Sequence, residues 1–134
     1  MRIFRDTDVP SRPVDDRSFT GPAFTKLLAS ADEGAAVHVY RVVFEPGGRT
    51  NWHTHSGPQW LFVTEGQIRF QCWVQPPAQA AAGDAVLFFP GEKHWHGAPP
   101  GERGVHLAVN VSVQTEWLEP VSEEMYQAAL TPGN

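Results

Sequence analysis

Hydrophobic and polar positions alternate along much of this chain with the two-residue period of β-strands. The segment 67–75 is the clearest case, with glutamine and arginine side chains on one face. The residues that share its other, apolar face are Ile68, Phe70, Cys72 and Val74. Other runs rich in β-branched and aromatic residues end at glycine or proline, which is typical of short strands joined by turns. The predicted strands cover residues 35–45, 59–64, 67–75, 85–89 and 104–113.

A helix is predicted only near the end of the chain, over residues 122–130. Ser122 is a suitable N-cap, and Glu123 and Glu124 place negative charge in the first turn, where the helix dipole favours it. Residues 1–20 are polar and predict an extended arm, and residues 78–82 predict an alanine-rich connector. Many antiparallel strands followed by one helix indicate an all-β sandwich or barrel.

Composition narrows this picture to one globular domain over residues 1–134. Hydrophobic residues make up 41% of the chain and charged residues 19%, and the twelve glycines and twelve prolines require frequent turns. A net charge of −5 argues against nucleic acid as a partner, and the sequence predicts neither a membrane span nor a signal peptide. A single cysteine, Cys72, is simplest in a reducing, cytoplasmic setting, where we expect it to be a buried structural thiol.

Three histidines and one amide are spaced so that they could bind a single metal ion. His53 and His55 are two residues apart, which places both imidazoles on one face of a strand. Gln59 begins the next apolar run, and His94 follows a distant Pro-Gly turn. Neutral imidazole binds divalent zinc, copper, iron, nickel and, in mixed sites, manganese. The alternative for Gln59 is a buried amide bonded to the backbone.

Further polar residues are predicted beside this site. His96 shares the face of His94, either as a general acid or base or as a residue that orients another. His106 shares its strand face with Ala108 and Asn110, which predicts a cavity lining; the alternative is a histidine bonded inside the barrel. Thr50 offers a hydroxyl near the site, or is an ordinary strand threonine. The tryptophans at 52, 60, 73 and 95 are expected to pack in the barrel or an interface, and the phenylalanines at 62, 70, 88 and 89 are expected in the core.

These motifs resemble those of the cupins. The segment from Pro46-Gly47 through His53, His55 and Gln59 to Gly66 meets every spacing of the first cupin motif, and the segment from Gly83 to His94 resembles the second. The sequence departs from the general pattern at Gln59, where an acid is usual, and at Ala98, where asparagine is frequent. The resemblance implies a single cupin barrel (a double-stranded β-helix or jelly roll) over residues 22–113.

The combination His-x-His-x3-Gln, with Pro-Gly-Glu-Lys-His-Trp-His-Gly-Ala and the tail 116–122, is similar to a narrower group. This group contains the manganese-dependent cupin hydroxynitrile lyases and the cupins related to the C-terminal domain of carboxymuconolactone decarboxylases. The resemblance implies a divalent metal ion, Mn2+ before Fe2+, Zn2+, Ni2+ or Co2+, at His53, His55, Gln59 and His94. It also implies a pocket that includes Tyr40, Val42, Thr50, His96, His106 and Asn110.

The function implied is a metal-dependent lyase that cleaves or forms cyanohydrins of small aldehydes, with His106, His96 and Thr50 as catalytic residues. An amide ligand does not cancel the charge of the ion, which should then polarise a bound hydroxyl more strongly. A metal-dependent dioxygenase or isomerase and a non-enzymatic small-molecule-binding cupin remain alternatives, because cupins host many functions. The arm and the aromatic strands lead us to expect a homodimer or homotetramer.

Overall fold

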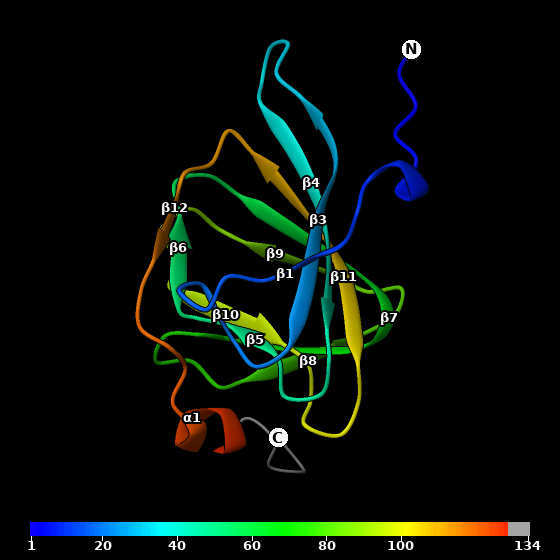
Figure 1. Ribbon diagram of the computed structural model, residues 1–134. Helices are drawn as coiled ribbons and strands as arrows, with labels where there is room; N and C mark the ends of the chain where they lie inside the picture. The colour runs from blue at the N-terminus through cyan, green and yellow to red at the C-terminus, as the bar shows by residue number, and fades with distance from the viewer. Residues whose placement is uncertain (129–134) are drawn as a thin grey trace.

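The computed structural model describes residues 1–128 as a curled, almost entirely β structure with one short helix at its base (Figure 1). Its first element is a 3-10 turn, η1 (Asp6–Asp8). The strands are β1 (Arg12–Pro13), β2 (Phe19–Thr20), β3 (Ala23–Ala31), β4 (Val37–Phe44), β5 (Arg49–Thr50), β6 (His53–His55), β7 (Gln59–Cys72), β8 (Ala78–Ala81), β9 (Ala85–Phe88), β10 (His94–Gly97), β11 (Gly104–Val111) and β12 (Thr115–Trp117). The helix α1 spans Glu123–Ala128.

The strands that the structure describes form one antiparallel sheet whose two halves share the long strand β7. In the first half the order is β1-β3-β4-β11-β7, and β9 pairs with the other edge of β7. In the second half β7 pairs with β8 and β10, β10 pairs with β5 and β6, and β2 and β12 complete the edges. The sheet therefore curls around an interior onto which β4, β6, β10 and β11 all face.

The two strands predicted over 59–64 and 67–75 are one strand, β7, so this prediction was wrong in detail. Gly66 lies between them with a φ of 63°, a backbone conformation that other residues rarely adopt. A Cβ at this position would also lie 2.3 Å from the carbonyl oxygen of Arg103. Glycine therefore lets the strand bend from one half of the sheet into the other without ending. Val74, predicted to be on the inner face, lies beyond the strand and is exposed.

The structure also differs from the sequence prediction at β3, which no pattern predicted, and at the segment 78–82, whereas the helix agrees with it. The expected connector at 78–82 contains β8, which pairs with the second half of β7 and buries Ala80. The helix begins where it was predicted, and the Ser122 hydroxyl oxygen accepts a hydrogen bond from the Met125 backbone N–H at 3.1 Å, as an N-cap does. Residues 129–130 of the predicted helix lie outside the described residues. No helix within residues 1–128 has the length and apolar character needed to cross a membrane.

The interior is filled by apolar side chains in two connected regions of the barrel and a third region at its base. Phe44, Ile68 and Leu61 are fully buried inside the barrel. At the base, Trp52, Trp95, Val121 and Tyr126 form the cluster that holds α1 against the sheet.

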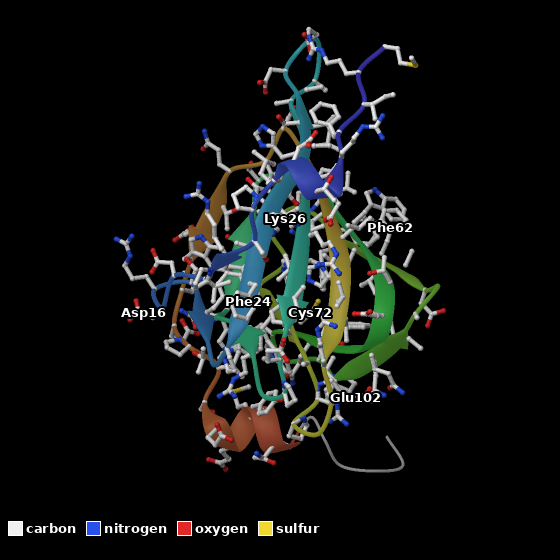
Figure 2. The ribbon with its side chains drawn as sticks, turned by 45° about the vertical axis from the view of Figure 1, so that its right-hand side comes forward. Asp16, Phe24, Lys26, Phe62, Cys72 and Glu102 are labelled. Carbon is white, nitrogen blue, oxygen red and sulfur yellow. The ribbon has the colours of Figure 1, made fainter. Side chains whose placement is uncertain are left out.

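Phe62 and Phe89 were expected in the core, but both are exposed, and Figure 2 shows Phe62 on the outer side of the barrel wall.

The N-terminal arm lies on the chain's own sheet. Strand β1 pairs with β3, and β2 pairs with β5. This second pairing places Phe19 directly opposite Thr50. The arm therefore brings an aromatic side chain to the interior that holds the candidate site.

Candidate metal centre and active site

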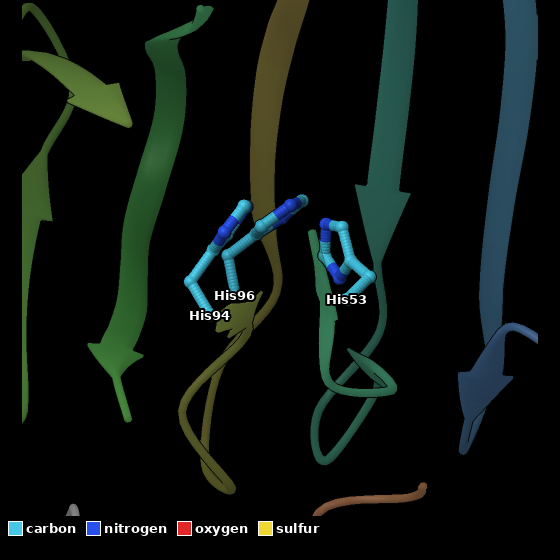
Figure 3. A group of neighbouring side chains, drawn as sticks. All are labelled: His53, His94 and His96. Atoms are coloured by element: carbon cyan, nitrogen blue, oxygen red, sulfur yellow. The ribbon is translucent and has the colours of Figure 1, made fainter. Parts of the chain in front are cut away.

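The histidines predicted as metal ligands converge from two paired strands. His53 and His55 lie on β6, and His94 on β10 is the direct cross-strand neighbour of His53. The ring centroids of His53 and His94 are 4.3 Å apart, and those of His53 and His55 are 4.9 Å apart. All three side chains are buried. Figure 3 shows His53 facing His94 and His96, which stand side by side on β10.

Hydrogen bonds at Nδ1 orient the imidazole rings of these three histidines. Nδ1 of His53 lies 2.8 Å from the carbonyl oxygen of Asn51, and Nδ1 of His94 lies 2.8 Å from the carbonyl oxygen of Glu92. A carbonyl oxygen only accepts, so both Nδ1 atoms carry the proton and donate it. Nδ1 of His55 pairs with the Thr115 hydroxyl at 2.8 Å. In neutral His53 and His94, Nε2 is therefore left with a free lone pair, the arrangement that metal-binding histidines adopt.

The side chain of Gln59 faces that of His94 in an arrangement that a bound cation would stabilise. The Gln59 amide nitrogen donates to Oδ1 of Asn110 at 2.9 Å, which turns its carbonyl oxygen, Oε1, toward Nε2 of His94 at 3.3 Å. Both of these facing atoms are acceptors in the tautomer set by Glu92. Two buried lone pairs at this distance repel each other unless a positive ion lies between or beside them. The donor set therefore fits a divalent metal ion, and a carbonyl oxygen with imidazole nitrogens suits a hard or borderline ion.

Burial keeps the imidazoles of the site neutral. Desolvation lowers the pKa of His94 to about 4 and that of His106 to about 3. The pKa of His53 and that of His96 fall well below 6.5, first through desolvation and then through neighbouring histidines, and desolvation also lowers the pKa of His55. Neutral imidazole is the form that binds metal, so the site is in its metal-binding protonation state at neutral pH.

His96 is a further candidate ligand beyond the predicted set. The ligating nitrogens of His53, His94 and His96 all lie within 4.8 Å of one another. His94 and His96 have nearly parallel rings with centroids 5.8 Å apart. Nε2 of His96 is buried and has no hydrogen-bond partner among the described residues. The structure thus holds two overlapping donor sets, which share His53 and His94 and differ in whether His55 and Gln59 or His96 completes them.

The other nitrogen of His96 connects it to His106. Nδ1 of His96 lies 3.0 Å from Nε2 of His106, and both residues are buried. One of these nitrogens donates to the other, so the two imidazoles form a pair along which a proton can pass. The Thr50 hydroxyl accepts the backbone N–H of His96 at 3.1 Å, which ties β5 to β10 beside this pair. Thr50 thus positions His96 and still has its own hydroxyl proton to donate.

These residues surround a single cavity of about 290 Å³. Nine of the ten predicted site residues line it, and the tenth, His94, lies 3.3 Å from one of them, Gln59. The nine are Tyr40, Val42, Thr50, His53, His55, Gln59, His96, His106 and Asn110. Sequence reasoning missed Phe19 and Trp117, which line the same cavity. Phe19 belongs to no motif, and Trp117 lies in the tail 116–122 without a ligand type to mark it, so only the strand register places the two rings here.

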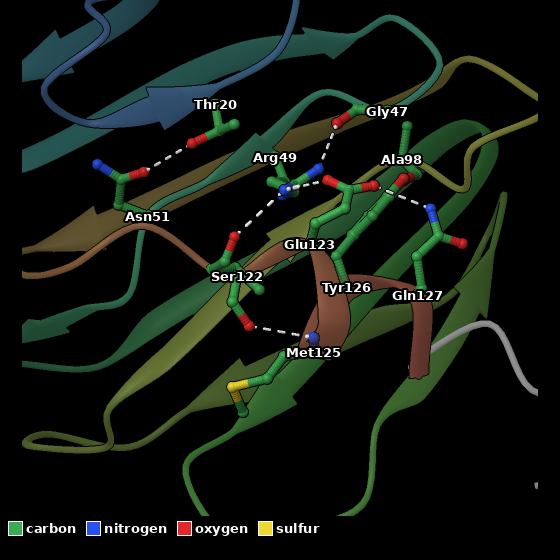
Figure 4. Close-up of polar contacts among 11 residues, drawn as sticks. Thr20, Gly47, Arg49, Asn51, Ala98, Ser122, Glu123, Met125, Tyr126 and Gln127 are labelled. Atoms are coloured by element: carbon green, nitrogen blue, oxygen red, sulfur yellow. Dashed lines mark hydrogen bonds and ion pairs between the residues drawn. The ribbon is translucent and has the colours of Figure 1, made fainter.

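The base of the site is fixed by α1. Tyr126 donates its hydroxyl proton to the carbonyl oxygen of Ala98, and the Arg49 guanidinium lies 4.1 Å from the Tyr126 ring centroid (Figure 4). Arg49 also donates to the Val121 carbonyl and to the Glu123 carboxylate, at 3.2 and 3.0 Å. These contacts hold the helix against β5, the strand that carries Thr50.

Comparison with known proteins agrees with this geometry. Residues 40–110, more than half of the chain, match the cupin domain family. The chain is a cupin. It is 42% identical over 117 residues to an (R)-mandelonitrile lyase from Granulicella tundricola, with 81% of this chain and 86% of that protein covered.

Solved structures resemble this cupin over most of its length. A cupin-like protein from Thermotoga maritima is 41% identical, with a TM-score of 0.84, and the match covers 91% of this chain and 94% of that one. The polyketide cyclase RemF from Streptomyces resistomycificus has a TM-score of 0.74 at 21% identity, and the match covers 98% and 94% of the two chains. The second likeness is one of fold alone.

Proposed function

We propose that this cupin is a metal-dependent lyase of the hydroxynitrile lyase type, which cleaves or forms cyanohydrins of small aldehydes. The observation that carries the proposal is the pair of acceptors, Nε2 of His94 and Oε1 of Gln59, that face each other at 3.3 Å beside an imidazole pair. The identity of 42% with a mandelonitrile lyase supports the choice of reaction. His53, His55, Gln59 and His94 would hold the ion, and Mn2+ is the metal we favour.

A bound divalent ion would supply Lewis acidity, which lowers the pKa of a hydroxyl beside it. His96 lines the cavity, and its Nε2 has no hydrogen-bond partner among the described residues. In the tautomer whose Nδ1–H donates to His106, the lone pair on Nε2 is placed to take the hydroxyl proton. Nδ1 of His96 contacts His106, so that the second imidazole shares the proton. As the bond between the carbinol carbon and the nitrile carbon breaks, cyanide leaves with the electron pair and takes this proton to form hydrogen cyanide. The remaining carbon and oxygen become the aldehyde.

The imidazoles of His96 and His106 are buried, so the protonated form of either is unstable and gives its proton up readily. The pKa of His106 is lowered to about 3 by desolvation, so its protonated form returns the proton readily to a basic leaving group. Val42 and Ala108 line the cavity near the pair and limit the water that could compete for the proton.

The experiment is cleavage of mandelonitrile by purified protein loaded with Mn2+, followed as benzaldehyde release. The controls are His53→Ala, which removes a ligand, and His106→Ala, in which the metal content is expected to persist. We expect metal-dependent release by the wild type, and at least a hundredfold loss of kcat/KM in His106→Ala, the order expected for a general base. Wild-type turnover by His106→Ala would refute the role of the pair, and oxygen uptake with bound iron would favour a dioxygenase instead.

A further inference from the structure

Two aromatic side chains outside the cupin motifs form one wall of the cavity. Phe19 comes from β2 in the arm, and Trp117 comes from β12 after the last long strand. Their ring centroids are 5.9 Å apart, with an angle of 41° between the planes. Both line the cavity that holds the candidate metal ligands. We refer to Phe19 and Trp117 together as the aromatic wall.

Strand register explains why these rings reach the site. Phe19 is the direct cross-strand neighbour of Thr50, and Trp117 is the direct neighbour of His53. Residues directly opposite each other in a sheet present their side chains on the same face. The Trp117 ring accordingly lies 4.6 Å from the His53 ring, centroid to centroid, with 37° between the planes. Each residue of the aromatic wall is thus adjacent to a predicted site residue that lines the cavity.

Phe19 packs against the core, whereas Trp117 keeps exposed surface and lines the cavity. The Phe19 ring packs on fully buried Phe44 with centroids 6.1 Å apart. Trp117 is 41% exposed in spite of its contacts with Phe19 and His53. An aromatic group bound in the cavity would bury part of both rings and gain from contact with them. Val42 and Ala108 on β4 and β11 add apolar surface to the same cavity.

We infer that the aromatic wall binds the aryl group of the substrate, so that this cupin prefers cyanohydrins of aromatic aldehydes to those of small aliphatic aldehydes. The inference rests on the proposed function, whose substrate class it specifies. Aromatic rings gain from stacking or edge contacts beyond the surface that they bury. The cavity of about 290 Å³ lies just below the usual range for small-molecule sites, roughly 300–1,000 Å³, which favours a substrate with a single ring.

The test compares kcat/KM for mandelonitrile with that for lactonitrile, the cyanohydrin of acetaldehyde, in the metal-loaded protein. A substitution that damages the site in general lowers kcat/KM for both nitriles alike, and the ratio of the two values then stays the same. In Trp117→Leu and in Phe19→Leu the ratio should fall about two- to tenfold, the range that one aromatic contact provides. Trp60→Leu and Phe24→Leu are matched controls, because these rings are 40% and 36% exposed and lie outside the cavity. Both controls should keep the wild-type ratio.

Metal content is measured in each variant, because Trp117 touches His53, and Phe19→Leu provides the test without that contact. An unchanged ratio in both wall variants would overturn the inference. If the wild type cleaves neither nitrile, the proposed lyase activity fails, and the wall is then tested by saturation-transfer NMR of benzyl alcohol. Binding that weakens in both wall variants but not in Trp60→Leu would support an aryl site. Binding that is absent, or equal in all variants, would overturn it.

Discussion

Acid should destabilise this protein through its buried neutral histidines, and His106 gives the clearest measurement. The pKa of His106 is about 3 in the folded chain, against 6.5 for an ordinary histidine. A group with a lowered pKa in the folded state stabilises that state above the unfolded pKa. This stability is lost as the pH falls from 6.5 toward 3, because the unfolded chain binds the proton that the folded chain refuses.

The size of this loss of stability follows from the pH range between the folded and the unfolded pKa of His106. One pKa unit corresponds to about 1.4 kcal/mol, so moving from about pH 7.5 to about pH 5 costs roughly 2 kcal/mol for His106 alone. His94, with its pKa lowered to about 4, contributes a similar loss of about 2 kcal/mol over the same interval. The free energy of unfolding of the metal-free protein should therefore fall by several kcal/mol between these two pH values.

The assay is urea unfolding at both pH values with a chelator present, for the wild type, His106→Gln and Val42→Ala. His106→Gln removes one titrating group, so its loss of stability on acidification should be smaller than that of the wild type by about 2 kcal/mol. Val42→Ala removes buried apolar surface in the same cavity, so it should lower stability equally at both pH values. An identical pH dependence in His106→Gln and the wild type would mean that His106 is not neutral in the folded chain and charged in the unfolded chain, contrary to the prediction.

Three other predictions concern the metal and the frame around it. Asn110→Ala removes the acceptor that turns the Gln59 amide, so the Kd for Mn2+ measured by calorimetry should rise about 10- to 100-fold; an unchanged Kd would contradict Gln59 as a ligand. His96→Ala should keep its metal, as measured by elemental analysis, and equal loss of metal in His96→Ala and His53→Ala would instead favour the three-histidine set. Tyr126→Phe leaves the Ala98 carbonyl without its donor and should lower the free energy of unfolding by roughly 1–3 kcal/mol in urea titrations, whereas no change would mean that water replaces the hydroxyl.

The resemblance of the sequence to the cupins predicted their fold, and the family match over residues 40–110 confirms it. Period-two alternation and glycine or proline at strand ends are local properties, so they located β4, β7, β9 and β11 within a few residues. They did not predict the nine-residue strand β3 or the short edge strands, which form by pairing with those four or with one another. The same local logic failed at Gly66, where a glycine that usually ends a strand bends one instead. It also failed for Ala78–Ala81, because a run of alanines has no strong strand preference and forms β8 only by pairing with β7.

For the site, the sequence predicted the types of ligand, and the tertiary structure supplied their geometry. The spacing of His53 and His55 and the turn before His94 predicted a metal site, because ligand type and strand period are both visible in the chain. The structure alone revealed the lone pairs of Gln59 and His94 that face each other, and the contact between His96 and His106. These depend on pairings between strands that lie far apart in sequence.

The aromatic side chains show the same division. Hydrophobicity predicted Phe62 and Phe89 for the core, yet the curl of the sheet leaves both on its outer side. No sequence pattern marked Phe19 or Trp117 as a pocket residue, and cross-strand register with β5 and β6 places them at the cavity. A sequence pattern fixes which residues share a face of one strand. Which face turns inward, and which distant side chain stands opposite, is decided only when the sheet closes around its core.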